Sequence, residues 1–150
     1  MISITRSIII DRPAADVFAL VDDPARYPEF FTGVTRWESR SKRKRGPGAK
    51  YRVLMKVGSI EAGGTVVVTE RVANRLIGWE AEKGISQRGR WDLRPIDEDS
   101  TEVSLEVTFD LSGGPIGTLV ERMAGRIVSR NLWATLLAAR RLVEEAALSG

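Results

Sequence analysis

The sequence contains neither cysteine nor histidine, and these two absences exclude several kinds of chemistry. Without cysteine the chain forms no disulfide, no thiolate nucleophile and no zinc–thiolate site. Without histidine it has no imidazole base, no Ser-His or Cys-His nucleophile and no His-ligated metal. The clustered carboxylates, Asp22-Asp23 and Asp97-Glu98-Asp99, are typical of a helix start and a loop. No metal and no cofactor are therefore expected.

Long hydrophobic runs and strong net charge are also absent. No apolar stretch approaches the ~20 residues that cross a bilayer, and residues 1–10 lack the apolar core of a signal peptide. The formal net charge of +3 is too slight for a typical nucleic-acid-binding composition. The 150 residues contain no linker, repeat or low-complexity segment. We therefore expect one domain over residues 1–150, a cytoplasmic location and no nucleic-acid partner.

The stretch from Gly117 to Leu148 has the periodicity of one long amphipathic helix. At ~100° per residue, its apolar arc shifts between the first and second halves. The arc centres first on Ile116, Val120, Met123 and Ile127, and then on Leu132, Leu136, Ala139 and Val143. A helix whose apolar face rotates in this way is expected to pack against a curved surface.

The rest of the chain is dominated by strand patterns. A strand over residues 3–11 is followed by two short helices, Ala14–Val21 and Ala25–Phe31, the second with Asp23 as N-cap. Six strands are expected over residues 34–40, 51–57, 60–72, 75–82, 85–95 and 101–111, with a bulge or bend at Gly63-Gly64. This β-α-α-β6-α order predicts an α+β fold. In it, a strongly bent antiparallel sheet of about seven strands wraps round the long C-terminal helix.

Three stretches of the sequence resemble a known superfamily. They are residues 8–18 (IIIDRPAADVF), residues 21–30 (VDDPARYPEF) and residues 89–95 (GRWDLRP), the last followed by Ser100-Thr101-Glu102-Val103. Together they resemble the START-like (SRPBCC) helix-grip superfamily, specifically its bacterial polyketide cyclase/dehydrase and lipid-transport group. The resemblance covers essentially the whole chain. It implies a helix-grip fold with an apolar cavity between the sheet and the long helix.

The implied cavity gives the inward-facing residues a candidate role, because large, adaptable apolar side chains suit small-molecule pockets. The candidate ligand-binding residues are Tyr51, Val53, Met55, Trp79, Gln87, Trp91, Phe109, Met123, Ile127 and Asn131. Within this set, the facing of Trp79 is ambiguous, and Gln87 and Asn131 are the polar groups for orienting a ligand. The alternative is that these side chains fill the core, with the two amides hydrogen-bonded inside it.

The function expected from this resemblance is binding of a hydrophobic or amphipathic small molecule, such as a lipid, a polyketide or a quinone. A polyketide cyclase/dehydratase-type enzyme acting in the same cavity is one alternative. It requires a base and an oxyanion donor. Tyr51 is the only plausible inward-facing donor, and Gly63-Gly64 obscures the facing of Glu61 and Glu70. We therefore favour binding over catalysis and keep Tyr51 as the catalytic candidate.

A run of basic residues supports a second alternative, a membrane-associated ubiquinone-binding accessory protein. The five positive charges are those of Arg40, Lys42, Arg43, Lys44 and Arg45. Near an anionic membrane each contributes about 1 kcal/mol of attraction. At the turn of a hairpin, the same charges are equally typical of a solvated loop that protects a sheet edge. We favour the solvated loop and keep a weak membrane contact as the alternative.

Overall fold

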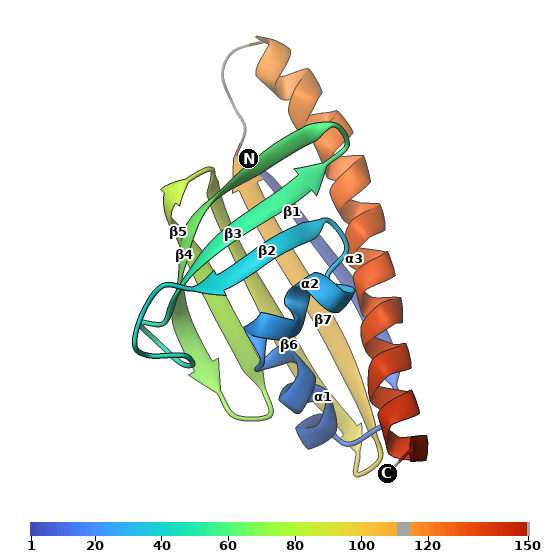
Figure 1. Cartoon of the computed structure of the whole chain (residues 1–150). Coiled ribbons are helices and arrows are strands. Elements are labelled where there is room, and N and C mark those ends of the chain that lie inside the picture. Colours follow the sequence, from blue (N-terminus) through green and yellow to red (C-terminus); the bar gives the residue numbers. More distant parts are fainter. Residues whose placement is uncertain (111–114, 150) are drawn as a thin grey trace.

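One curled antiparallel sheet and one long helix make up most of the computed structural model, which describes residues 1–110 and 115–149 (Figure 1). The strands are β1 (Ile2–Ile10), β2 (Val34–Ser39), β3 (Lys50–Val57), β4 (Ile60–Val72), β5 (Leu76–Gly84), β6 (Ser86–Asp97) and β7 (Ser100–Asp110). The helical segments are α1 (Ala14–Val21), η1 (Pro24–Arg26), α2 (Tyr27–Phe30) and α3 (Pro115–Ser149). Leu111, the predicted end of the last strand, lies outside the described residues.

The strands form a seven-stranded sheet in the order β1-β7-β6-β5-β4-β3-β2. Consecutive strands from β2 to β7 are antiparallel neighbours, and β1 pairs with β7 in the register Ile8↔Val103. The sheet curls so that its concave side faces α3, while α1 and α2 close the lower part of that side (Figure 1). This arrangement confirms the predicted α+β helix-grip fold.

The predicted distortion at Gly63-Gly64 arises from a close approach of two backbones. Gly84 has φ of +92°, and a Cβ there would lie 2.3 Å from the carbonyl oxygen of Gly63. The β4–β5 register shifts just beyond this point, between Thr65 and Val66. Glycine permits both the positive φ and the contact. The bulge helps to bend the sheet.

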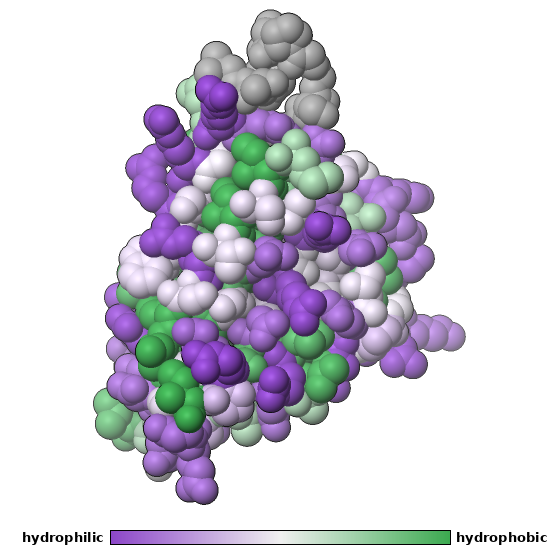
Figure 2. Space-filling model, turned by 180° about the vertical axis from the view of Figure 1, so that it is seen from behind, coloured by the Kyte–Doolittle hydropathy of each residue, from purple (hydrophilic) through white to green (hydrophobic). Residues whose placement is uncertain are grey.

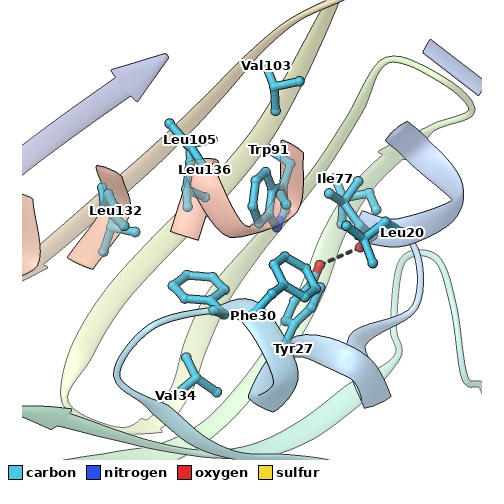
Figure 3. Packing of buried hydrophobic residues seen from close by; sticks show 14 of the residues in the cluster. Leu20, Tyr27, Phe30, Val34, Ile77, Trp91, Val103, Leu105, Leu132 and Leu136 are labelled. Carbon is cyan, nitrogen blue, oxygen red and sulfur yellow. Dashed lines mark hydrogen bonds between the residues drawn. The ribbon is translucent and has the colours of Figure 1, made fainter. Parts of the chain in front are cut away.

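Aromatic rings from the second helical region and four strands meet in the core. This aromatic cluster consists of Tyr27, Phe30, Phe31, Trp37, Tyr51, Trp79 and Trp91. The Tyr27 and Trp37 ring centroids are 4.8 Å apart, and those of Trp37 and Trp79 are 5.3 Å apart. The Tyr27 hydroxyl donates a 2.5 Å hydrogen bond to the carbonyl oxygen of Val21, drawn as the dashed line at Tyr27 in Figure 3.

The second predicted helix requires a correction. Residues 25–31 were expected to form one helix, but the structure divides the region into η1 and α2, and Asp23 makes no side-chain capping bond. The neighbouring Asp22 instead accepts two hydrogen bonds from Arg71, both 2.8 Å. Tertiary contacts thus place a carboxylate of this acidic pair against an arginine of β4.

The apolar arc of α3 also differs from the prediction. Leu132 and Leu136 face the core as expected (Figure 3). Among the described side chains of the first half, the buried apolar ones are those of Ala124 and Val128, whereas Met123 is 60% exposed. The side chain of Ile116, part of the predicted arc, lies outside the described residues. Ala124 and Val128 precede Leu132 by eight and four positions, so they continue the same helical face. The large apolar residues of the first half suggest a rotation of the apolar face. The small residue Ala124 is the one that continues the face of Val128 and Leu132.

The face opposite to the view of Figure 1 is largely hydrophilic, with apolar residues in separate groups (Figure 2). Trp133 is partly exposed, and the Arg6 guanidinium lies over its ring, 5.0 Å from the centroid. Within residues 1–110 and 115–149, no helix combines the length and apolar character needed to cross a membrane.

Candidate functional site

An apolar cavity of about 80 Å³ lies between the sheet and α3. Its walls come from the end of α2, from β3, β4, β6 and β7, and from the first half of α3. The lining residues are Phe31, Thr32, Met55, Val57, Ala62, Gly63, Ile85, Gln87, Val107, Phe109, Ala124, Val128, Asn131 and Leu132. The polar side chains of this lining are those of Thr32, Gln87 and Asn131.

Regular spacing explains why most of these residues face the cavity. Met55 and Val57 on β3, and Val107 and Phe109 on β7, are separated by two positions, so each pair projects from the same face of its strand. On α3, residues 124, 128, 131 and 132 follow the spacing of one helical face. The cavity therefore lies where the concave side of the sheet meets one face of α3.

Hydrogen bonds hold the chain that follows α2 at the rim of the cavity. The Thr32 N–H donates to Thr135 Oγ1 at 2.9 Å, and Thr135 Oγ1 donates to the carbonyl oxygen of Asn131 at 2.7 Å. The Lys56 N–H donates to the Gly33 carbonyl oxygen at 2.7 Å. These bonds attach residues 32 and 33 to both α3 and β3. Phe31 thereby belongs to both the cavity lining and the aromatic cluster, with its ring centroid 6.0 Å from that of Trp91.

The structure brings four of the predicted ligand-binding residues together in the lining: Met55, Gln87, Phe109 and Asn131. They come from β3, β6, β7 and α3, so no local sequence motif joins them. Their part in binding a ligand remains a prediction.

The other six candidates lie outside the lining. Tyr51, Val53, Trp79 and Trp91 are buried, and three of these four belong to the aromatic cluster. Met123 points to solvent, and Ile127 is half-buried beside the β3–β4 turn, where a Cβ on Gly58 would lie 3.3 Å from its Cδ1. Four of the six candidates are thus part of the packed core outside the cavity lining.

Several residues that line the cavity are not among those predicted from the sequence. Ala124 and Val128 carry a usable signal, because they are in phase with Leu132, Leu136 and Ala139 on α3. Phe31 and Thr32 carry none, because they follow a short helix and reach the cavity only through the rim hydrogen bonds.

The acidic and tyrosine candidates for catalysis lie away from the cavity. The Tyr51 hydroxyl donates to the carbonyl oxygen of Lys44, in the β2–β3 connection. Glu61 is exposed, and Glu70 pairs with Arg90, with 3.2 Å between Glu70 Oε1 and the guanidinium nitrogen. Among the described lining residues, none has a side chain that ionises in the physiological pH range.

Both tyrosines of the chain are expected to resist ionisation until the protein unfolds in alkali. Burial raises the pKa of Tyr27 and also that of Tyr51, where the charge of Arg45 opposes the increase. A raised pKa in the folded state means that stability is complete below about pH 10 and falls as the pH rises further, because the unfolded tyrosines then release protons more readily. Near-ultraviolet absorbance should show tyrosinate appearing together with unfolding. The urea-unfolded chain should titrate near pH 10, and separate titration of a folded tyrosine would contradict the prediction.

The basic residues lie in the β2–β3 connection, and some are tied back to the fold. Arg45 Nε donates to the Asp22 carbonyl oxygen at 3.0 Å, and Lys44 Nζ donates to Ser39 Oγ at 3.0 Å. Arg40, Lys42 and Arg43 are exposed as well. The predicted membrane contact through this segment stays a prediction.

Solved structures with low sequence identity share this fold. TTHA0849 from Thermus thermophilus is 18% identical, with a TM-score of 0.83 over 97% of this chain and 99% of that one. The Zhui aromatase/cyclase from Streptomyces sp. R1128 is 19% identical, with a TM-score of 0.82 over 97% and 95% of the two chains. A START superfamily protein from Mycobacterium smegmatis is 16% identical, with a TM-score of 0.75 over 93% and 98%. At such identities the likeness concerns the fold alone.

Sequence comparison places the chain in a family. The uncharacterized protein Rv0088 of Mycobacterium tuberculosis is 32% identical over 108 residues, which are 71% of this chain and 46% of that protein. The chain thus spans about half the length of the curated relatives that it matches. Residues 1–144 match the sequence model described as polyketide cyclase / dehydrase and lipid transport. The match covers nearly all of the chain, which therefore belongs to this family, a family associated with binding of hydrophobic ligands.

Proposed function

We propose that this chain binds a hydrophobic or amphipathic small molecule, of the lipid, polyketide or quinone kind, in the cavity between the sheet and α3. The observation that carries the proposal is the composition of that cavity. Met55, Val107, Phe109, Val128 and other apolar side chains surround it, and a few amide and hydroxyl groups interrupt them. Small-molecule sites commonly combine a mostly apolar wall with a few polar groups in this way.

The size of the cavity limits how a ligand enters. An apolar cavity of about 150 Å³ accommodates benzene, so a space of about 80 Å³ must widen to take a ring or a chain. Met55 and Val57 are half-buried and lie near the end of β3 that leads into the β3–β4 turn. Methionine adapts readily because its side chain is unbranched. Affinity would come mainly from apolar burial, at about 25 cal/mol per Å² before the costs of association.

Binding is preferred to catalysis because the described part of the lining offers no general acid or base. The hydroxyl of Tyr51 is engaged by the Lys44 carbonyl, and the cavity walls carry amides and one threonine hydroxyl instead. An amide orients a substrate by hydrogen bonding, but it does not take up a proton at neutral pH. Tyr51→Phe is therefore a suitable variant for separating the two functions.

The proposal predicts that the protein retains or captures an apolar ligand. Native mass spectrometry of freshly purified protein, followed by extraction, should reveal a bound lipid, quinone or polyketide. Added members of these classes should raise the melting temperature, since a ligand that binds only the folded state stabilises it by about 2.7 kcal/mol at a hundred times its Kd. Tyr51→Phe should bind equally well. A clean mass together with no thermal shift across the panel would contradict the proposal.

A further inference from the structure

We propose that the cavity selects uncharged ligands and rejects the ionised forms of the same molecules. This inference rests on the proposed function and specifies its ligand class: an apolar body bearing a carbonyl, ester or hydroxyl group, without a carboxylate, phosphate or ammonium group. The selection depends on which side chains reach the cavity and on where the neighbouring charges point.

The basic residues that adjoin the lining point away from it. Of the adjoining acidic residues, Glu61 and Glu106 are exposed, and Asp110 lies 3.8 Å from the N-terminal amino group. Lys56 lies between Met55 and Val57 on β3, and Arg88 follows Gln87 on β6; both are exposed because strand alternation turns them to the opposite face. On α3, Arg126 and Arg130 lie on the exposed side of the helix, although Arg130 is adjacent to Asn131. These cations are therefore close to lining residues in the sequence, but their side chains lie on the exposed side of the strand or helix, away from the cavity.

The polar groups that do line the cavity suit a neutral partner. Gln87 and Asn131 carry carboxamides, each of which both donates and accepts hydrogen bonds, and Thr32 carries a hydroxyl. These groups satisfy a carbonyl or hydroxyl oxygen of a ligand without any change in net charge. The cavity faces the middle of the 35-residue helix α3, so neither end of the helix dipole lies beside it to offset a ligand charge.

Desolvation then discriminates between neutral and ionised ligands. A charge moved from water into an apolar site without a counter-charge loses solvation, and amides restore only part of it. The pKa of a group buried in this way therefore shifts so that its neutral form is favoured. A discrimination of tenfold corresponds to about 1.4 kcal/mol. We expect at least about tenfold weaker binding for an anion or a cation than for its neutral analogue.

Three single-ring probes of similar size test the inference: methyl benzoate, benzoate and benzylammonium. Each would be titrated into isotopically labelled protein at neutral pH, and binding would be followed by the NMR shifts of the Gln87 and Asn131 side-chain amides. The neutral ester should move both amides, and the two ions should bind at least about tenfold more weakly. Benzoate should gain affinity as the pH falls toward its own pKa, because only the protonated acid enters.

A charged variant provides the converse test. Gln87→Arg places a cation in the wall at a half-buried position near the start of β6. Binding of benzoate should then strengthen relative to methyl benzoate by about tenfold. Equal binding of all three probes to the unaltered protein would overturn the charge selection and leave the proposed function in place. Failure of every probe, and of the wider panel of lipids and quinones, would overturn both.

Discussion

Gly89→Ala is expected to lower the free energy of unfolding by about 3 kcal/mol, the upper part of the usual range for overpacking a core. An added Cβ would lie 2.1 Å from Trp79 Cζ2 and 2.4 Å from its Cε2. The Trp79 ring cannot move aside freely, because it is buried and packs edge-on against Trp37. Urea unfolding followed by tryptophan fluorescence would measure the change.

Gly125→Ala is the matched control for this substitution. Gly125 lies inside α3, and a Cβ there would meet Ile2 Cδ1 at 3.4 Å, an ordinary van der Waals contact. Alanine is favoured over glycine within a helix by about 0.5–1 kcal/mol, so this variant should be more stable than the unaltered chain. Equal unfolding midpoints for the two variants would show that Trp79 does not lie across Gly89.

Ala124→Leu is expected to abolish ligand binding in the cavity. Ala124 is buried on α3 and its side chain contributes directly to the wall. Leucine adds three carbon atoms to a space of about 80 Å³, and so competes with a ligand for the same volume. Filling an apolar cavity commonly stabilises a protein by about 0.5–2 kcal/mol, so the variant should remain folded. The thermal shift produced by any ligand found with the unaltered protein should disappear.

Ala147→Leu makes the same change outside the site. Ala147 is exposed near the end of α3, away from the cavity lining. This control should keep both the melting temperature and the full ligand response. If Ala124→Leu also kept the full response while remaining folded, the ligand would have to bind elsewhere on the molecule, and the proposed site would be wrong.

The fold was largely predictable because periodicity is a local property that reports on the environment of each element. Val103, Leu105 and Val107 alternate with polar residues along β7, and all three are buried. The predicted limits of α1 match the structure, and those of the strands agree with it closely. The second helix was less well predicted, since residues 25–31 divide between η1 and α2 and the expected N-cap residue Asp23 makes no side-chain capping bond.

The candidate site was predictable only in part. Strand alternation correctly predicted that Met55, Gln87 and Phe109 face the concave side of the sheet. It predicted the same for Tyr51 and Trp91, which are buried in the core outside the cavity lining. Periodicity predicts on which face of a strand or helix a residue lies, but it does not predict where along that face the core is filled and where a cavity remains. The difference between lining a cavity and filling a core depends on which rings meet in space.

Hydrophobic patterning was therefore enough to predict the order of strands and helices along the chain, the long terminal helix and most of the faces that they bury. Each element reports its own solvent exposure through the spacing of nearby residues. The position and limits of the cavity arose only when distant elements came together. The rings of Tyr27, Trp37, Trp79 and Trp91 pack together in the core outside the lining, whereas Phe31, whose ring adjoins that of Trp91, also lines the cavity. Packing of this kind depends on the three-dimensional contacts of side chains that no local repeat links.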